Sequence, residues 1–256
     1  MLHSSKTLAG YTLTATDGSV GRAQIFYFDD RDWSIRYLIA ETGSFLVGRQ
    51  VLIAPYSLLG VDPASMTIGI SLSKAQIENS PSLDTDKPVS QQFAEECYEY
   101  YGWPAYWHAA KLVGPFDQSA GVLEAKIPGL PEERSWDIHL RSTGEVDGYI
   151  IEAEGSAAGH IVDLIIDPTA WTIRYLVAET GPWWGGRRIL IAPSWIESIS
   201  CLNKKVSILL KMEQIKLAPE YKEPFQITRE YEASLHRHYN LQGYWVDEPT
   251  ELPAVR

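Results

Sequence analysis

An internal repeat is the feature that most constrains this chain. At a spacing of 138 residues, the run 33–43 matches the run 171–181, and 52–55 matches 190–193. No gap is needed, and there are about 30 identities over about 106 aligned positions, where about 6 are expected by chance. The repeat indicates a duplication and predicts two copies of one fold.

The copies are large enough to be domains. Residues 1–107 are predicted to form the first domain and residues 135–256 the second, each long enough to bury a core. Residues 108–134 contain Gly114-Pro115, Pro128-Gly129 and Pro131, which break regular structure and predict a linker. We therefore expect two domains rather than a solenoid.

The pattern within each copy favours short strands. Apolar and β-branched runs of four to ten residues alternate with turn signals such as Asp17-Gly18 and residues 29–32. A sheet of short strands can remove its exposed edges by curling closed, so each copy is expected to be a small barrel in a mainly β protein. The predicted strands are 10–15, 20–29, 33–41, 49–54 and 67–72 in copy one, and 163–166, 171–179, 188–192 and 206–210 in copy two.

Each copy is expected to end in an α-helix. Ser90 and Thr228 are equivalent candidate N-caps, and Gly102 and Asn240 are equivalent residues that tolerate the left-handed conformation at a helix end. The spacing i, i+4, i+7, i+8 predicts the buried face of each helix. The predicted faces are Phe93, Cys97, Tyr100 and Tyr101, and Tyr231, Leu235, His238 and Tyr239.

The motif order in each copy resembles the PRC-barrel domain. It reads Asp17-Gly18, Val20-Gly21, 33–38, 41–43, Gly48-Arg49 and 52–55 in copy one. The resemblance implies two PRC-type barrels in tandem, related by a pseudo-twofold duplication. It also points to the cytoplasmic part of the photosynthetic reaction-centre H subunit and to the C-terminal domain of a bacterial ribosome-maturation factor. Copy two departs from the pattern at its first hairpin, where Gly155-Ser156 replaces Asp17-Gly18.

Several polar residues occur at the same place in both copies. A functional interpretation makes the paired carboxylates an acid–base site oriented by arginines. The alternative is turn chemistry and ion pairing that hold the fold, which we favour because a fold has to exist twice in one chain and a catalytic site does not. The repeat-paired residues, with the two shared tryptophans, are Asp29, Trp33, Arg36, Glu41 and Arg49, and Asp167, Trp171, Arg174, Glu179 and Arg187. The two tryptophans are expected to be largely buried.

The histidines, the cysteines and the known sequence motifs give no indication of a catalytic, metal or cofactor site. His236 and His238 lie two apart on the expected helix and point in different directions, and Cys97 and Cys201 are not equivalent in the repeat. No phosphate loop, dinucleotide fingerprint or nucleophile elbow is present. We therefore expect no catalytic residue, no metal and no cofactor.

Charge and hydropathy limit which partners the chain is expected to bind and where in the cell it is expected to be. The 22 basic and 33 acidic residues give a net charge of −11, which disfavours direct nucleic-acid binding. No run approaches the roughly 18 apolar residues of a membrane helix, and residues 1–9 lack the apolar core of a signal peptide. A soluble, cytoplasmic protein without a transmembrane segment is expected.

One loop is a candidate interaction surface. Trp183 and Trp184 lie in a Gly-rich loop, at positions equivalent to Phe45 and Leu46 in copy one. Exposed aromatic residues of this kind often mark a partner site, whereas the alternative is that they pack within the fold.

Three classes of function follow. The leading hypothesis is a non-enzymatic protein-interaction and assembly module, in the specific form of a soluble accessory of a membrane electron-transfer or photosynthetic-type complex, with an unknown protein partner. The alternative is an adaptor in ribosome or RNA maturation that binds a ribosomal protein. An enzyme is the third class, and self-association is left open.

Overall fold

The computed structural model describes residues 1–42, 49–81, 83, 91–103, 139–181, 185–222 and 227–246. The chain forms two compact units that are discontinuous in sequence. Unit 1 contains Met1–Ala9, Phe26–Ile35 and Arg141–Arg256, and unit 2 contains Gly10–Ile25 and Arg36–Leu140. Two segments of copy one, residues 1–9 and 26–35, therefore belong to the unit that contains copy two.

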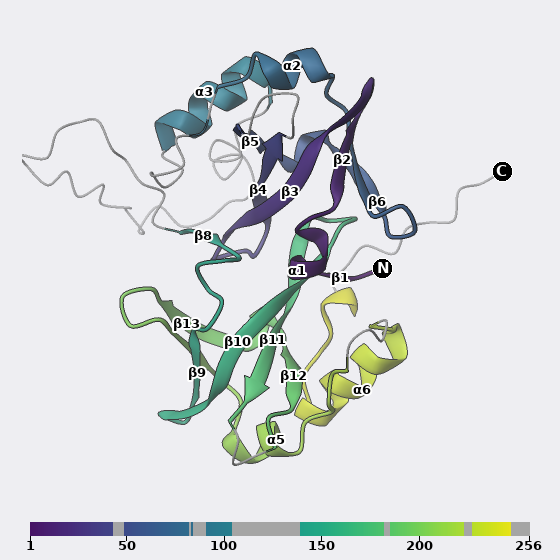
Figure 1. The fold of residues 1–256 in the computed structure, drawn as a ribbon. Helices are drawn as coiled ribbons and strands as arrows, with labels where there is room; N and C mark the ends of the chain where they lie inside the picture. The colour runs from purple at the N-terminus through teal and green to yellow at the C-terminus, as the bar shows by residue number, and fades with distance from the viewer. Residues whose placement is uncertain are drawn as a thin grey trace, which may run out of the picture. The chain divides into compact units, whose positions relative to one another are not determined.

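A seven-stranded sheet carries unit 2, in the order β5-β4-β3-β2-β7-β6, with β8 also paired to β3 (Figure 1). Strand β2 runs parallel to β7 and antiparallel to β3, and β5 and β6 are antiparallel to β4 and β7. The bounds are β2 Thr12–Ala15, β3 Gly18–Asp29, β4 Ile35–Thr42, β5 Gln50–Ile53, β6 Leu58–Asp62, β7 Thr67–Ile70 and β8 Leu140–Ser142.

The sheet of unit 1 has the same strand order, β12-β11-β10-β9-β14-β13. Strand β1, His3–Ser4, is added to β10, just as β8 is added to β3 in the other sheet. The bounds are β9 Ile150–Ala153, β10 Ser156–Asp167, β11 Thr172–Thr180, β12 Arg188–Ile191, β13 Ile196–Ser200 and β14 Lys205–Ile208. The predicted mainly β class is confirmed, with equivalent elements following at a spacing of about 138 residues.

Neither sheet is a closed barrel, so the predicted closure is wrong. Within the described residues, no ladder joins β5 to β6 or β12 to β13. The reason lies at Pro55 and Pro193, which follow β5 and β12, lack a backbone N–H and start the 3-10 helices η1 (Pro55–Ser57) and η3 (Pro193–Trp195). After each proline the chain moves away from the edge formed by β5 or β12. The next strands, β6 and β13, were not predicted from the sequence, and they pair with β7 and β14 instead.

The shared glycines and tryptophans have clear structural roles. A Cβ on Gly21 or Gly159 would lie 2.1 or 2.2 Å from the carbonyl oxygen of Glu41 or Glu179, so only glycine allows the neighbouring strand this close. Trp33 and Trp171 are buried, as predicted, and both have a left-handed backbone, with φ of 62° and 47°. That conformation is strained for a bulky residue, and packing compensates: in unit 1, Trp33 stacks on Phe28 and Trp171 on Phe26.

Two longer helices follow the sheets in sequence, α3 (Gln91–Tyr101) and α6 (Arg229–Tyr239). The Thr228 hydroxyl accepts from the Tyr231 N–H, and Asn240 is left-handed, so both predicted ends of α6 are confirmed. Gly102 ends α3 with φ 68°, whereas Ser90 lies outside the described residues. The shorter helices, with η4, are α1 Ser5–Leu8, α2 Lys74–Glu78, α5 Met212–Lys216 and η4 Tyr244–Val246.

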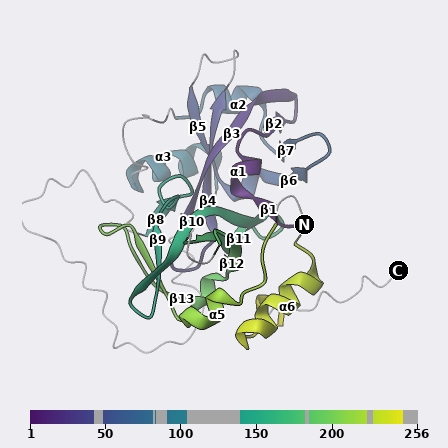
Figure 2. The same cartoon turned by 60° about the horizontal axis from the view of Figure 1, so that its bottom comes forward.

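The predicted helix faces need correction. The buried residues of α6 are Glu232, Leu235, His236 and Tyr239, a face rotated from the one that included Tyr231 and His238. On α3, Cys97 and Tyr98 are buried while Tyr100 is exposed. The two views show α2 near the ends of β2 and β3, where the Lys74 N–H donates to Asp17 at the turn between these strands (Figures 1 and 2).

No helix in the described part of the chain is both long and apolar enough to cross a lipid bilayer.

Candidate functional site

The repeat-paired aspartates serve as turn residues. Asp29 Oδ1 accepts from the Arg31 N–H at 3.0 Å, and Asp167 Oδ1 accepts from the Thr169 N–H at 3.0 Å. This i to i+2 bond is an Asx turn, and it confirms the turn interpretation at both positions. The second oxygen of each carboxylate is paired with a guanidinium, Asp29 with Arg31 and Asp167 with Arg174.

The repeat-paired arginines tie strands to the short helices. Arg49 donates to the backbone carbonyl oxygens of Glu78, the last residue of α2, and of Ser80 just beyond it. Arg187 donates to the backbone carbonyl oxygen of Lys216, the last residue of α5. A cation at a helix C-terminus satisfies free carbonyl groups and complements the helix dipole.

The other shared polar residues lie on the strands. Thr42 and Thr180 are the last residues of β4 and β11, and their hydroxyls donate to the carbonyl oxygens of Arg49 and Arg187 at 2.8 and 3.1 Å. Glu41 accepts from Gln24, Glu179 pairs with Arg188, and Arg36 is partly buried on β4. The shared polar set is therefore dispersed along the fold and forms no single cluster.

The candidate interaction loop falls outside the described residues. This applies to Trp183 and Trp184 and to their equivalents Phe45 and Leu46. Their role as a contact surface stays a prediction.

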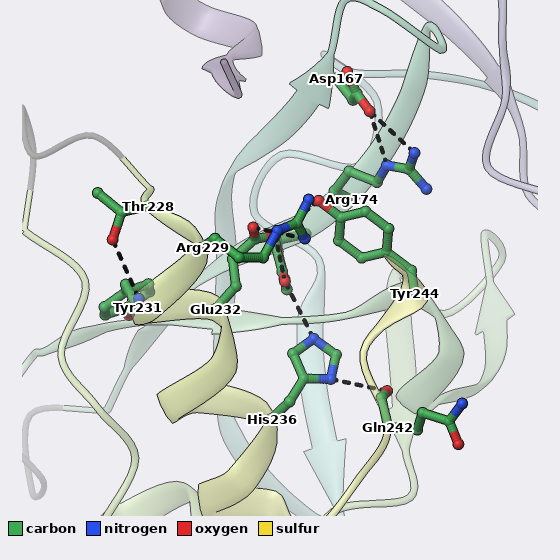
Figure 3. A network of polar contacts seen from close by, with 10 residues as sticks. Asp167, Arg174, Thr228, Arg229, Tyr231, Glu232, His236, Gln242 and Tyr244 are labelled. Atoms are coloured by element: carbon green, nitrogen blue, oxygen red, sulfur yellow. Dashed lines mark hydrogen bonds and ion pairs between the residues drawn. The ribbon is translucent and has the colours of Figure 1, made fainter. Parts of the chain in front are cut away.

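A buried polar network in unit 1 centres on Glu232 of α6, whose side chain is 3% exposed (Figure 3). The hydroxyls of Tyr175 and Tyr244 both donate to Glu232 Oε1, at 2.9 and 2.8 Å. Arg229, one turn earlier on α6, pairs with Oε2 at 3.1 Å. A buried carboxylate is tolerated because its two oxygens are engaged by a cation and two hydroxyl donors.

His236 extends this network toward the end of α6. Its Nδ1 lies 2.9 Å from the carbonyl oxygen of Gln242 (Figure 3). Its Nε2 lies 3.1 Å from the Tyr175 hydroxyl. Because a carbonyl only accepts, Nδ1 carries a proton and donates. In the neutral ring Nε2 is then an acceptor, so Tyr175 has one proton and two acceptors within reach, Glu232 and His236.

Aromatic rings and guanidinium groups surround the same cluster. The Arg174 guanidinium lies 4.0 Å from the Tyr244 ring centroid, and that of Arg229 lies 4.5 Å from the Trp245 centroid. The Trp245 ring contacts His236 edge-on at 4.9 Å. These contacts fix η4 against α6 and β11.

Burial controls the protonation of the network. It raises the pKa of the Tyr175 and Tyr244 phenols, with the Glu232 carboxylate adding to the effect, because a phenolate there would be desolvated beside a negative charge. Burial also lowers the pKa of His236, opposed by its bond to Gln242 and assisted by the Arg229 charge. Near neutral pH the phenols are protonated and His236 is neutral.

The arrangement is suited to positioning rather than to bond making. The Glu232 oxygens accept from protein donors, and His236 faces Tyr175 and a backbone carbonyl. Among the residues that the structure describes, no three His, Cys, Asp or Glu side chains gather in a way that could hold a metal ion. What the network does is hold η4, the segment Tyr244–Val246, in place.

Unit 2 builds the equivalent place with aromatic residues. In the repeat, His236 corresponds to Tyr98, Glu232 to Ala94 and Arg229 to Gln91. Tyr98 contacts Tyr37 edge-on at 6.1 Å, where unit 1 has His236 against Tyr175.

An indole is supplied from a different element in each unit. In unit 2, Trp103 packs on Tyr98 and Tyr101 and donates its Nε1–H to Ser57 at 3.0 Å. In unit 1, Trp195, the equivalent of Ser57, packs on His236 and Tyr239, which are the equivalents of Tyr98 and Tyr101. Leu241 stands at the position equivalent to Trp103. Each unit therefore fills this space with one tryptophan, which comes from the segment after α3 in unit 2 and from η3 in unit 1.

Sequence reasoning missed this network. His236 was considered only together with His238 as a metal ligand, and the predicted buried face of the helix did not include Glu232. A usable signal was the difference between copies: at aligned positions 91, 94 and 98 of copy one, copy two has Arg229, Glu232 and His236, three residues able to form a polar chain one turn apart.

No protein-family model matches the chain, and no curated protein matches it.

Proposed function

We propose that the chain is a tandem PRC-type protein, formed by duplication, that acts as a non-enzymatic interaction and assembly module. The specific role we propose is that of an accessory to a membrane electron-transfer or photosynthetic-type complex. The observation that carries the proposal is the use of the shared polar residues. Asp29, Asp167, Arg49 and Arg187 are engaged in turns and helix ends, which is the behaviour of a scaffold.

A reciprocal contact within unit 1 supports the duplication. The Ile35 N–H donates to Trp171 O at 2.7 Å, and the Ile173 N–H donates to Trp33 O at 2.9 Å. Each donor and acceptor is the repeat equivalent of the other, as expected of a pseudo-twofold relation. Such a contact favours a scaffold assembled from two copies of one domain.

The proposal is tested by removing the protein from its host. We expect deletion to reduce the amount of an intact membrane electron-transfer complex on native gels, to leave ribosomal subunit profiles in sucrose gradients unchanged, and to be reversed by complementation. Defective ribosomal profiles with intact membrane complexes would instead support the adaptor in ribosome maturation. Unchanged profiles in both assays would contradict a role in assembly.

The contact loop is tested in the same strain. Exposed residues contribute little to folding, whereas interface anchors can each contribute about 2 kcal/mol or more to binding. Complementation with Trp183→Ala/Trp184→Ala is therefore expected to fail although the purified variant melts like the wild type. A large drop in its melting temperature would show that the two tryptophans pack within the fold.

A further inference from the structure

The segment Tyr244–Val246 is held in unit 1 through a titratable side chain. We propose that His236 is a proton-sensitive latch, which keeps this segment docked on α6 when the imidazole is neutral and releases it when the imidazole is protonated. This inference concerns regulation within unit 1 and is independent of the proposed assembly role.

The latch consists of contacts on both sides of the imidazole. Nδ1 donates to the Gln242 carbonyl oxygen, two residues before the segment, and the Trp245 ring covers the imidazole edge-on at 4.9 Å. Tyr244 adds its bond to Glu232 Oε1 at 2.8 Å. With the segment docked, His236 is 3% exposed.

The surroundings of His236 contain few groups that could stabilise a positive charge. The titratable and charged groups that the structure places near His236 are Arg174 and Tyr175 on β11, Arg229, Glu232 and Tyr239 on α6, and Tyr244 on η4, while Trp195 of η3 and Trp245 pack their rings on the imidazole. Glu232 is the one carboxylate of this set, and it is paired with Arg229 and accepts from both phenols.

Protonation also changes the hydrogen bonds. When His236 is neutral, the single Tyr175 proton can go to Glu232 Oε1 or to His236 Nε2, at 2.9 and 3.1 Å. When His236 is protonated, Nε2 becomes a donor and Tyr175 can donate only to Glu232. Protonation therefore gains one hydrogen bond, from Nε2 to the neutral Tyr175 oxygen. It costs the desolvation of an imidazolium and repulsion from the Arg229 charge. The docked state consequently disfavours the protonated imidazole, and the pKa of His236 is lowered.

Linkage converts this preference into a change of population. A ligand that binds the undocked state more tightly shifts the equilibrium toward it, and here the ligand is a proton. For every unit by which docking lowers the His236 pKa, full protonation weakens docking tenfold. Release is expected as pH falls below about 6.5, the pKa of an exposed histidine.

The experiment uses the full chain labelled with 5-fluorotryptophan. The Trp245 fluorine resonance is assigned by its loss in Trp245→Phe, and its shift is followed by NMR between pH 8 and pH 5. We expect the resonance to move toward the position of an exposed tryptophan on acidification, with a midpoint below about 6.5. In parallel, histidine ring resonances of the wild type are titrated, and the His236 midpoint is expected to coincide with that of Trp245.

Two variants separate the latch from a general acid effect. His236→Gln should make the Trp245 resonance insensitive to pH over this range, while His238→Gln, on the same helix, should leave the wild-type transition in place. A Trp245 resonance that does not move in the wild type, or that moves equally in His236→Gln, would overturn the proposal. If His236→Gln fails to fold, different midpoints for His236 and Trp245 in the wild type would overturn it equally well.

Discussion

Helices α3 and α6 end equivalent stretches of the chain, yet they bury different chemistry. On α3, Tyr98 packs among the rings of Tyr37, Tyr56 and Trp103. On α6, the equivalent position is His236, and Glu232 one turn earlier binds two phenols and a guanidinium. The same sheet order and the same type of helix end thus accommodate either an aromatic cluster or a polar network.

The comparison shows where the two units are free to differ. Positions that make turns and helix ends are shared, because their backbone geometry leaves little choice, as at Gly21 and Gly159. The space under the helix only has to be filled and its polar groups satisfied. Since a buried ion pair is seldom more stable than an apolar replacement, the network of unit 1 contributes specific positioning of η4 rather than extra stability.

The largest expected effect comes from Trp195, whose equivalent in unit 2 is Ser57. Trp195→Ser installs the residue of unit 2 and removes an indole that is 2% exposed, so we expect a loss of about 3–5 kcal/mol in the free energy of unfolding. If the two arrangements are interchangeable, adding Leu241→Trp should restore part of the loss. Denaturant unfolding of the two single variants and the double variant measures the coupling.

A coupling energy near zero would contradict the exchange. It would mean that a tryptophan at 241 does not reach the space that Trp103 fills in unit 2. Leu217→Trp, at an exposed position of unit 1, is the control and should give no rescue.

Removing the central carboxylate is expected to have the next largest effect. Glu232→Ala leaves the Tyr175 and Tyr244 hydroxyls without this acceptor and Arg229 without this partner. We expect a cost of about 3 kcal/mol, the lower end of the range for buried pairs, because Arg229 is half exposed. Glu230→Ala, on the exposed side of the same helix turn, should leave the melting curve nearly unchanged.

A second substitution makes Glu232→Ala resemble unit 2 further, because Gln91 is the equivalent of Arg229. Arg229→Gln in the Glu232→Ala background should cost less than Arg229→Gln alone, because the guanidinium has already lost its partner. Equal costs in the two backgrounds would show that the ion pair contributes nothing to the network.

A smaller effect is expected from one phenol. Tyr175→Phe keeps the ring against His236 and removes one of the two hydroxyls at Glu232 Oε1, which should cost about 2 kcal/mol, as for a hydrogen bond to a charged group. Tyr244→Phe removes the other and serves as the comparison. Thermal or denaturant unfolding that gives no loss for either would show that solvent replaces both donors.

Much of the framework was predictable because it depends on local chemistry. The repeat predicted equivalent strands, and Thr228, Asn240 and Gly102 predicted helix ends because caps are read from single residues. Trp33 and Trp171 were predicted to be buried, but their left-handed backbone was not, since it depends on the rings they stack against. Sheet closure was predicted wrongly, because β6 and β13 form local hairpins with β7 and β14, and a hydropathy pattern does not show whether their other edge meets β5 or β12.

The network was missed because two helix faces share the same apolar residues. Leu235 and Tyr239 belong to both, and a choice by hydropathy favours Tyr231 over Glu232. The structure selects Glu232 because Tyr175, far away in the sequence, supplies a donor at that depth. A hydropathy pattern contains no information on where a distant hydroxyl will lie.

The smallest expected effect is the pH dependence of stability. The His236 pKa is lower in the folded chain than the roughly 6.5 of the unfolded chain, so below about pH 6.5 the unfolded chain takes up the proton first and the free energy of unfolding falls. At the alkaline end the buried phenols have a raised pKa, so the unfolded chain loses its phenol protons first above about pH 10 and the free energy of unfolding falls again.

His236→Tyr installs the residue of unit 2. It should reduce the acid loss in the free energy of unfolding by about 1.4 kcal/mol for each unit by which folding lowers the His236 pKa, and it should leave the alkaline loss in place. His3, whose pKa burial also lowers, is present in both proteins and cancels in the difference. Melting temperatures of the wild type and the variant from pH 5 to pH 11 provide the measurement, and parallel acid limbs would show that His236 titrates as it does in the unfolded chain.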